Sequence, residues 1–186
     1  FRFISLFSRR KNEYPRKVLF IELSEMGSTI LADPAMRKMR REGNAELYFV
    51  IFKSNAASLR LLNTIPETHV FTIRADGLSN LAVDSLRFLF WTRRRRIDTV
   101  IDLELFSRYS ALLTGLSGAA NRIGFHSFHN EGLYRGDMLT RRVAYNPCLH
   151  IAKNFIALVN AALADREELP FSKTLIGDDE IGLTRA

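Results

Sequence analysis

The chain has 186 residues, 47% of them hydrophobic, and a formal net charge of +7 at pH 7. This length predicts one domain, or one and a half, with enough apolar residues for a substantial core. Cys148 is the single cysteine, which excludes an internal disulfide and favours a reducing compartment such as the cytoplasm. No stretch reaches the roughly 18 apolar residues that a membrane-spanning helix needs.

The positive charge is concentrated at the N-terminus. Residues 1–17 hold six basic residues against one acidic residue, so they account for five of the seven excess positive charges. The same segment contains Phe1, Phe3 and Phe7. We interpret residues 1–16 as a basic, aromatic tail, which is either the stub of a segment held at an anionic membrane or a terminus without fixed structure. Because the chain begins without Met and ends in a polar stretch, we expect it to be part of a longer protein.

Hydrophobic periodicity predicts strands and helices that alternate along the chain. Residues 18–23 fit a buried central strand. The next helix either begins near Ser28 and kinks at Pro34, or begins at Pro34 with Asp33 as its cap, and it ends at Gly43. This alternation predicts an α/β fold, a Rossmann-like parallel sheet with helices on both faces, in a domain of residues 17–165. Further strands are expected at 46–52, 69–73, 98–103 and 121–125, helices at 56–62, 78–95, 107–116 and 149–164, and irregular structure at 128–139.

The turn after the first predicted strand carries the main candidate site. Ligands of parallel sheets bind at the carboxyl ends of the strands, and this turn contains Ser24, Glu25, Gly27 and Ser28. Glu25 is the sharpest candidate, because a carboxylate at that edge can accept a proton from a hydroxyl nucleophile; the alternative is an ordinary surface turn residue. Gly27 is expected to permit a close chain reversal. The chain has no Walker A motif and no G-x-G-x-x-G, so we expect no cofactor in this part of the protein.

Three other groups of residues are candidates for function. The arginines at 93–96 follow an aromatic stretch, and they either complement a helix dipole or, with residues 88–96 as a whole, form a membrane-surface patch. Asp102, Glu104 and Arg108 follow the fourth predicted strand and are expected at the same edge as Glu25. The histidines at 126, 129 and 150 match no zinc spacing, so no metal site is expected, and His150 fits the start of a helix.

Five short motifs occur in order within residues 17–164, and together they resemble the lipopolysaccharide heptosyltransferases of glycosyltransferase family nine. The resemblance implies the N-terminal, acceptor-side half of a GT-B fold. Residues 166–186 would then be a linker towards a C-terminal, donor-binding domain. The motifs are residues 17–28 with Pro34-Ala35-Met36, then residues 97–103, residues 108–113, Arg122-Ile123-Gly124-Phe125 and His150-Ile151-Ala152-Lys153-Asn154.

The resemblance also implies a reaction. It implies an inverting, metal-independent transfer of a sugar from a nucleotide-sugar to a cell-envelope glycan or glycolipid, in bacterial lipopolysaccharide biosynthesis. The enzyme would be cytoplasmic, at the inner face of the cytoplasmic membrane, with an anionic membrane surface as a partner and no nucleic acid. The N-terminal half alone is expected to be inactive, because its donor binds the other half.

One position departs from the family pattern. The family places an aspartate, its proposed base, directly after the glycine of the first turn, and this chain has Ser28 there. A serine hydroxyl is no base at neutral pH without a partner. We therefore assign the catalytic base to Glu25, with Glu104 as the next candidate. The alternatives are a different sugar or a non-catalytic scaffold, a pseudo-glycosyltransferase at the membrane surface. The residues expected to bind the acceptor are Ser24, Gly27, Ser28, Glu104, Arg108 and His150.

Overall fold

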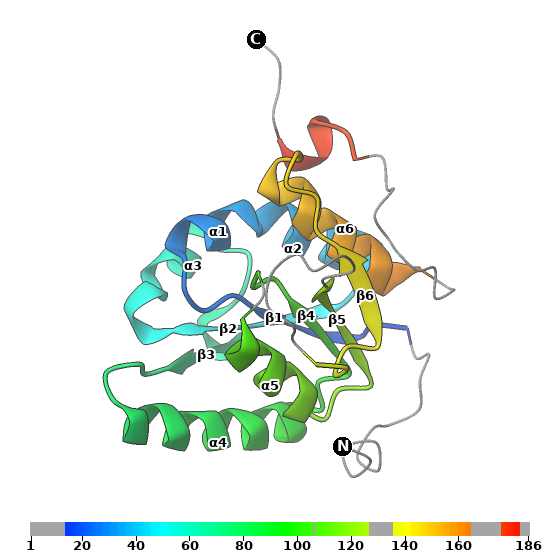
Figure 1. Ribbon diagram of the computed structural model, residues 1–186. Helices are drawn as coiled ribbons and strands as arrows, with labels where there is room; N and C mark the ends of the chain where they lie inside the picture. The colour runs from blue at the N-terminus through cyan, green and yellow to red at the C-terminus, as the bar shows by residue number, and fades with distance from the viewer. Residues whose placement is uncertain (1–13, 106, 127–135, 165–175, 183–186) are drawn as a thin grey trace.

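The computed structural model describes residues 14–105, 107–126, 136–164 and 176–182, and within them the chain forms one six-stranded sheet. All five neighbouring strand pairs are parallel, and the order across the sheet is β3-β2-β1-β4-β5-β6 (Figure 1). The strands are β1 (Lys17–Ile21), β2 (Glu46–Phe52), β3 (Val70–Ile73), β4 (Thr99–Asp102), β5 (Asn121–His126) and β6 (Arg141–Ala144).

Helices cover both faces of this sheet, which confirms the predicted Rossmann-like α/β architecture (Figure 1). Helices α1, α2, α3 and α6 lie on one face, and α4 and α5 on the other. Short 3-10 turns complete the connections. The helices are α1 (Met26–Leu31), α2 (Asp33–Gly43), α3 (Ala57–Leu62), α4 (Leu78–Arg95), α5 (Arg108–Leu116) and α6 (Ile151–Leu163), and the 3-10 turns are η2 (Lys53–Asn55), η3 (Glu67–His69) and η4 (Asp179–Ile181).

The central strand β1 is apolar on both faces because helices cover both. Val18 and Phe20 belong to the hydrophobic cluster that includes residues of α2 and α6. Leu19 and Ile21 alternate with them and belong to the second cluster, with Phe88 of α4 and residues of α5. All of these side chains are fully buried. Successive side chains of β1 therefore point alternately into the two clusters, as expected for a strand that is buried on both faces.

The segment after β1 forms two helices, α1 and α2, separated at Ala32. This agrees better with the prediction of a helix that begins near Ser28 and kinks at Pro34 than with a helix that begins only at Pro34. Pro34 lies in the first turn of α2, where its lack of an N–H is tolerated. The alternative role of Asp33 as a cap is wrong. Asp33 is the first residue of α2, and Ala32 occupies the N-cap position. Asp33 instead pairs with Arg37 (2.6 Å) and accepts a hydrogen bond from Thr64.

Strand β6 was not predicted, because its sequence, Arg-Arg-Val-Ala, has no apolar run. Its first residue, Arg141, is buried despite its charge. The guanidinium donates to the carbonyls of Ala161 and Ala164 (2.8 Å to Ala164) at the end of α6. Those carbonyls have no partner within the helix, so a cation there is stabilised. This contact, which no local pattern reveals, explains an arginine in an edge strand.

The predicted membrane patch of residues 88–96 does not form one surface. Phe88 is fully buried, and Trp91 packs on Phe88 and Phe71. Of the arginines at the end of α4, Arg93 instead connects α4 to the end of α5. Arg93 donates to the carbonyls of Leu89 and Leu116, both at 2.8 Å. Most of the predicted tail, residues 1–13, lies outside the described residues, as does the histidine at 129. In the part of the chain that is described, no helix is long and apolar enough to cross a membrane.

Part of the expected linker is described, and it contacts the domain. Turn η4 packs against α2 and α6. Lys38 of α2 pairs with Glu180 (2.7 Å), and Lys153 of α6 pairs with Asp178 (2.5 Å). These ion pairs place residues 176–182 on the helical layer formed by α2 and α6.

Candidate active site

The turn after β1 lies where the order of the sheet changes direction. From β1 the chain proceeds outward to β2 and β3, and then returns to place β4 on the other side of β1. The ladder continues past the end of β1, since Glu22 N–H donates to the Val50 carbonyl (3.3 Å) and Leu103 N–H to the Ile21 carbonyl (2.9 Å). Ligands of doubly wound sheets bind at this kind of switch point. The prediction that residues 24–28 lie at the carboxyl edge of the sheet is therefore confirmed.

Glu104 fixes the turn from the side of β4. Its Oε1 accepts hydrogen bonds from Leu23 N–H (2.8 Å), Ser24 N–H (3.0 Å) and the Ser24 hydroxyl (2.9 Å). The Glu104 side chain is buried. Three donors on one carboxylate oxygen make a charge-assisted network that is costly to break. The structure thus brings Glu104 and Ser24 together, with Glu104 positioning the turn.

Asn55 fixes the same turn from the side of β2. Its Nδ2 donates to the carbonyls of Leu23 (3.0 Å) and Ser24 (2.9 Å). Glu104 therefore holds the N–H groups of two consecutive residues, and Asn55 holds their carbonyls. The sequence interpretation missed Asn55, although a polar residue just after a predicted strand was an available signal.

Glu25 follows this clamped pair and is exposed. It occupies the N-cap position of α1, and its Oε2 accepts a hydrogen bond from the Ser28 hydroxyl (2.8 Å). Its backbone carbonyl accepts from Thr29 N–H (3.2 Å) and the Thr29 hydroxyl (2.9 Å). Ser28, which stands where the family has its aspartate, therefore orients the Glu25 carboxylate.

Glu22 lies beneath the turn and was not singled out from the sequence. It is 3% exposed. Burial, followed by the negative charges of Glu104 and Asp102, raises the pKa of Glu22 to about 9, while the backbone amide of Glu25 acts in the opposite direction. Glu22 is therefore protonated at neutral pH. A carboxylate next to an otherwise apolar strand is the sequence feature that could have identified Glu22 as a buried polar residue.

A buried polar chain continues from Glu104 into α5. Glu104 N–H donates to Asp102 Oδ1 (3.1 Å), and the Thr114 hydroxyl donates to Asp102 Oδ2 (3.3 Å). Asp102 is fully buried. Among the described residues, no three His, Cys, Asp or Glu side chains are arranged to hold a metal ion. The Asp102 and Glu104 carboxylates therefore support the turn through hydrogen bonds.

The role predicted for Gly27 is wrong. Gly27 is the second residue of α1, and its φ is not in the left-handed region, so the chain reversal does not depend on it. A Cβ at this position would meet no atom within 4 Å. What Gly27 leaves is open space beside Glu25, where a ligand can approach the backbone closely.

Replacing Gly27 with Ala is expected to stabilise the fold by about 0.5 kcal/mol, because alanine favours a helix and nothing obstructs its methyl group. Urea unfolding measures the change. Gly115→Ala is the matched control, since the Met138 side chain occupies the space of the new Cβ, and this substitution should destabilise by about 1–3 kcal/mol. A Gly27→Ala protein less stable than the wild type would contradict the open geometry.

Arg108 and His150 lie at the same edge of the sheet. Arg108 is the exposed first residue of α5. His150 is the N-cap of α6, where its Nδ1 accepts from Ala152 N–H (3.3 Å). The helix-start interpretation of His150 is confirmed. In the described part of the chain neither side chain hydrogen-bonds to Glu25. The hydrogen-bonded turn is therefore separate from the helix starts that carry Arg108 and His150.

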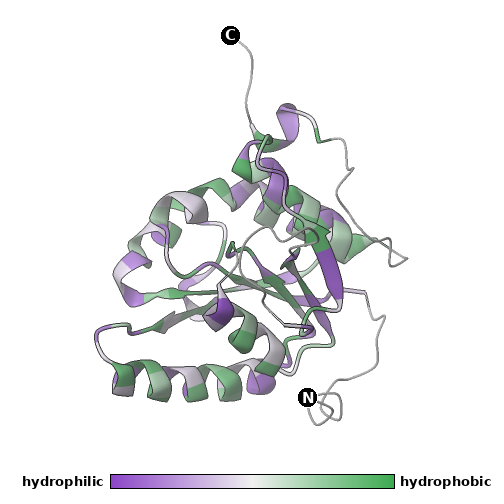
Figure 2. Ribbon diagram, in the orientation of Figure 1, coloured by the Kyte–Doolittle hydropathy of each residue, from purple (hydrophilic) through white to green (hydrophobic). Residues whose placement is uncertain are grey.

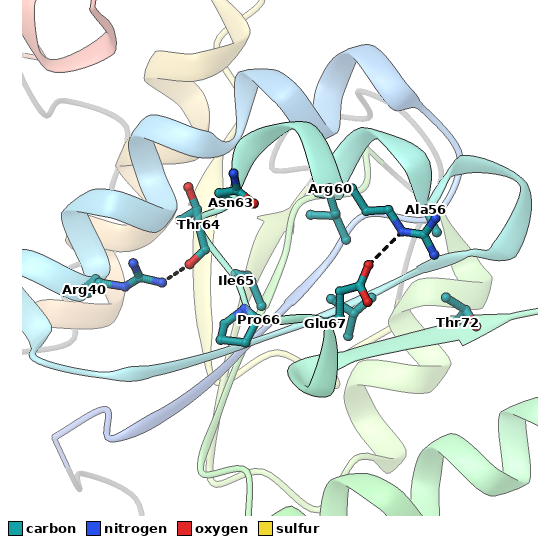
Figure 3. Close-up of a pocket in the computed structure, with 11 residues that line it drawn as sticks. Arg40, Ala56, Arg60, Asn63, Thr64, Ile65, Pro66, Glu67 and Thr72 are labelled. Carbon is teal, nitrogen blue, oxygen red and sulfur yellow. Dashed lines mark hydrogen bonds and ion pairs between the residues drawn. The ribbon is translucent and has the colours of Figure 1, made fainter.

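A hollow of about 490 Å³ lies elsewhere, over the edge strand β3 beside α2 and α3 (Figure 3). Arg40 donates to the Thr64 carbonyl there, and Arg60 pairs with Glu67 (2.9 Å). Both cations have protein partners, and no residue of the clamped turn lines this hollow. It is separate from the candidate site.

Known proteins similar to this chain are found among solved structures. No family model matches the chain, and no curated protein matches it significantly. Solved structures do match. E. coli heptosyltransferase WaaC with ADP-2-deoxy-2-fluoro heptose superposes with a TM-score of 0.67 at 16% identity, over 82% of this chain and 50% of that one. A family 9 glycosyl transferase from Veillonella parvula gives 0.64 at 15% identity, over 84% and 44%.

A third structure, E. coli ADP-heptose lps heptosyltransferase II, gives a TM-score of 0.62 at 16% identity, over 88% of this chain and 47% of its own. The chain spans about half the length of these proteins. It has a glycosyltransferase-like, Rossmann-like fold, and the resemblance to heptosyltransferases stated from the sequence motifs is confirmed at the level of the fold.

Proposed function

We propose that the chain is the N-terminal, acceptor-side domain of an inverting, metal-independent glycosyltransferase that acts in the cytoplasm on a cell-envelope glycan or glycolipid. The observation that carries the proposal is the exposed Glu25 carboxylate on a clamped turn at the switch point of this fold. A glycosyl acceptor is a hydroxyl group, and a carboxylate at that edge can take its proton.

In this proposal Glu25 removes the proton of the acceptor hydroxyl as that oxygen attacks the anomeric carbon of the donor. A new carbon–oxygen bond forms there while the bond to the nucleoside diphosphate breaks, and the diphosphate departs with the electron pair. Ser28 donates to Glu25 Oε2, which leaves Oε1 to face the acceptor. Glu104 and Asn55 hold the backbone that carries Glu25, so the base is positioned before the acceptor binds.

The donor is proposed to bind a second domain beyond this chain. Two of the similar structures, both of E. coli heptosyltransferase WaaC, are described with ADP-2-deoxy-2-fluoro heptose and with ADP, and this chain covers only about half of each. A nucleotide-sugar, with ADP-heptose as the first to test, is therefore the donor class that we propose. Ser24, Gly27, Arg108 and His150 are proposed to contact the acceptor from the same edge.

A non-catalytic scaffold is the second candidate. It is favoured by Ser28, which replaces the aspartate that the resembling family places at this position. Such a scaffold would retain the fold and bind glycan without transferring sugar.

The full-length protein, incubated with a panel of nucleotide-sugars and an extracted cell-envelope glycolipid, tests the proposal. We expect release of a nucleoside diphosphate that depends on the glycolipid and persists in the presence of EDTA, with an inverted anomeric configuration in the product. Glycolipid binding without any diphosphate release would support the scaffold instead. Transfer with a retained configuration would contradict the mechanism.

A further inference from the structure

Helix α4 carries hydrophobic side chains on the face that points away from the sheet. Its inner face is defined by Asp84, Phe88 and Thr92, which are spaced by four residues and are buried. Leu86 and Phe90 lie on the opposite face and are 69% and 67% exposed. Figure 2 shows hydrophobic residues recurring along α4, at the lower edge of the molecule in that view. An amphipathic helix normally presents polar residues there.

The orientation of α4 is fixed, so these side chains cannot turn inward. Asp84 accepts two hydrogen bonds from the Arg74 guanidinium (2.8 and 2.9 Å). At the other end of the helix, the Thr92 hydroxyl donates to the Ser117 carbonyl (2.9 Å). Phe88 packs between them against Phe71. These contacts hold both halves of α4 against β3 and the end of α5.

Basic side chains border the hydrophobic stripe. Helical spacing places Arg87 and Arg94 along one side of Leu86 and Phe90, and Arg93 along the other. The Arg87 side chain is 66% exposed, and Arg93 and Arg94 are exposed. The single acidic residue of α4, Asp84, is buried and pairs with Arg74 (2.8 Å) and, at 3.4 Å, with Arg87. The outer face of α4 is therefore apolar at its centre and positive at its borders.

We propose that the outer face of α4 binds an anionic lipid bilayer, with the helix lying in the plane of the interface. Apolar side chains enter the boundary of the acyl chains, while arginines contact the headgroup phosphates. A second copy of this chain fits the face less well, because a symmetric contact would bring the same arginines together. This proposal replaces the patch of residues 88–96 expected from the sequence, and it does not depend on the proposed enzymatic activity.

Co-sedimentation with lipid vesicles tests the proposal. The full chain is expected to bind vesicles made of equal parts of phosphatidylcholine and phosphatidylglycerol, and not vesicles of phosphatidylcholine alone. Leu86→Ser with Phe90→Ser should weaken binding at least about tenfold, because two large apolar side chains leave the interface. Arg87→Gln with Arg94→Gln should weaken it by about tenfold or more and reduce its dependence on salt.

Matched control variants distinguish binding through the outer face of α4 from non-specific binding to vesicles. Leu61 and Leu112 are 78% and 48% exposed on α3 and α5, and Leu61→Ser with Leu112→Ser should leave binding unchanged. Arg41→Gln with Arg60→Gln removes two charges from the opposite face and should also have little effect. Equal binding to neutral and anionic vesicles, or unchanged binding by both α4 variants, would overturn the proposal. Self-association that the α4 substitutions abolish, without any lipid binding, would identify a second copy as the occupant instead.

Discussion

Glu25→Gln in the full-length protein is expected to lower kcat by about 10²–10⁴-fold, the range found when a general base is removed. Glutamine keeps the length of the side chain and its hydrogen bond with Ser28, but it cannot take the proton of the acceptor hydroxyl. Glu25 is exposed, and its carboxylate hydrogen-bonds to the neighbouring Ser28. Folding and donor binding should therefore be nearly unchanged, and steady-state kinetics together with nucleotide binding measure both effects.

Two comparison variants make this result specific. Glu67→Gln removes an exposed carboxylate near α3 and should leave kcat unaffected. Glu104→Gln should lower both kcat and stability, because Glu104 binds Leu23, Ser24 and the Ser24 hydroxyl. If Glu25→Gln retains wild-type turnover, then Glu25 is not the base. A loss confined to Glu104→Gln, with the fold intact, would transfer that role to Glu104.

Glu22→Gln is expected to stabilise the domain at neutral and alkaline pH. The pKa of Glu22 is raised to about 9 in the folded protein, chiefly by burial, whereas an unfolded glutamate titrates at about 4.3. Between these values the unfolded state has lost a proton that the folded state keeps, so the wild-type domain loses stability as pH rises through this window. At pH 7 the gain from Glu22→Gln should be roughly 3–4 kcal/mol.

Urea unfolding of both proteins between pH 4.5 and pH 9 measures this effect. The two stabilities should differ least at the acidic end, where the unfolded-state Glu22 is still partly neutral, and should diverge as pH rises. Glu67→Gln, a substitution at an exposed position, should leave the profile within about 0.5 kcal/mol of the wild type. A pH-independent gain would mean that packing, and not protonation, causes the change.

Some elements follow from local pattern alone. Residues 46–52 and 78–95 have the predicted bounds of β2 and α4, because each has a clear hydrophobic period and a polar or glycine boundary. Strand β6 could not be found in this way. It is held by pairing with β5 and by the contact of Arg141 with the end of α6, and both are interactions between distant parts of the chain.

The candidate site shows the same division. The sequence by itself determined that Ser24, Glu25 and Ser28 follow a buried parallel strand, and hence that they lie at the carboxyl edge of a sheet, since period and turn chemistry are local properties. Only the tertiary structure decided what holds them. Glu104 and Asn55 reach the turn from β4 and η2, and Glu22 is protonated because the charges of Glu104 and Asp102 add to its burial. Such contacts and pKa shifts depend on distances across the sheet, which sequence spacing does not determine.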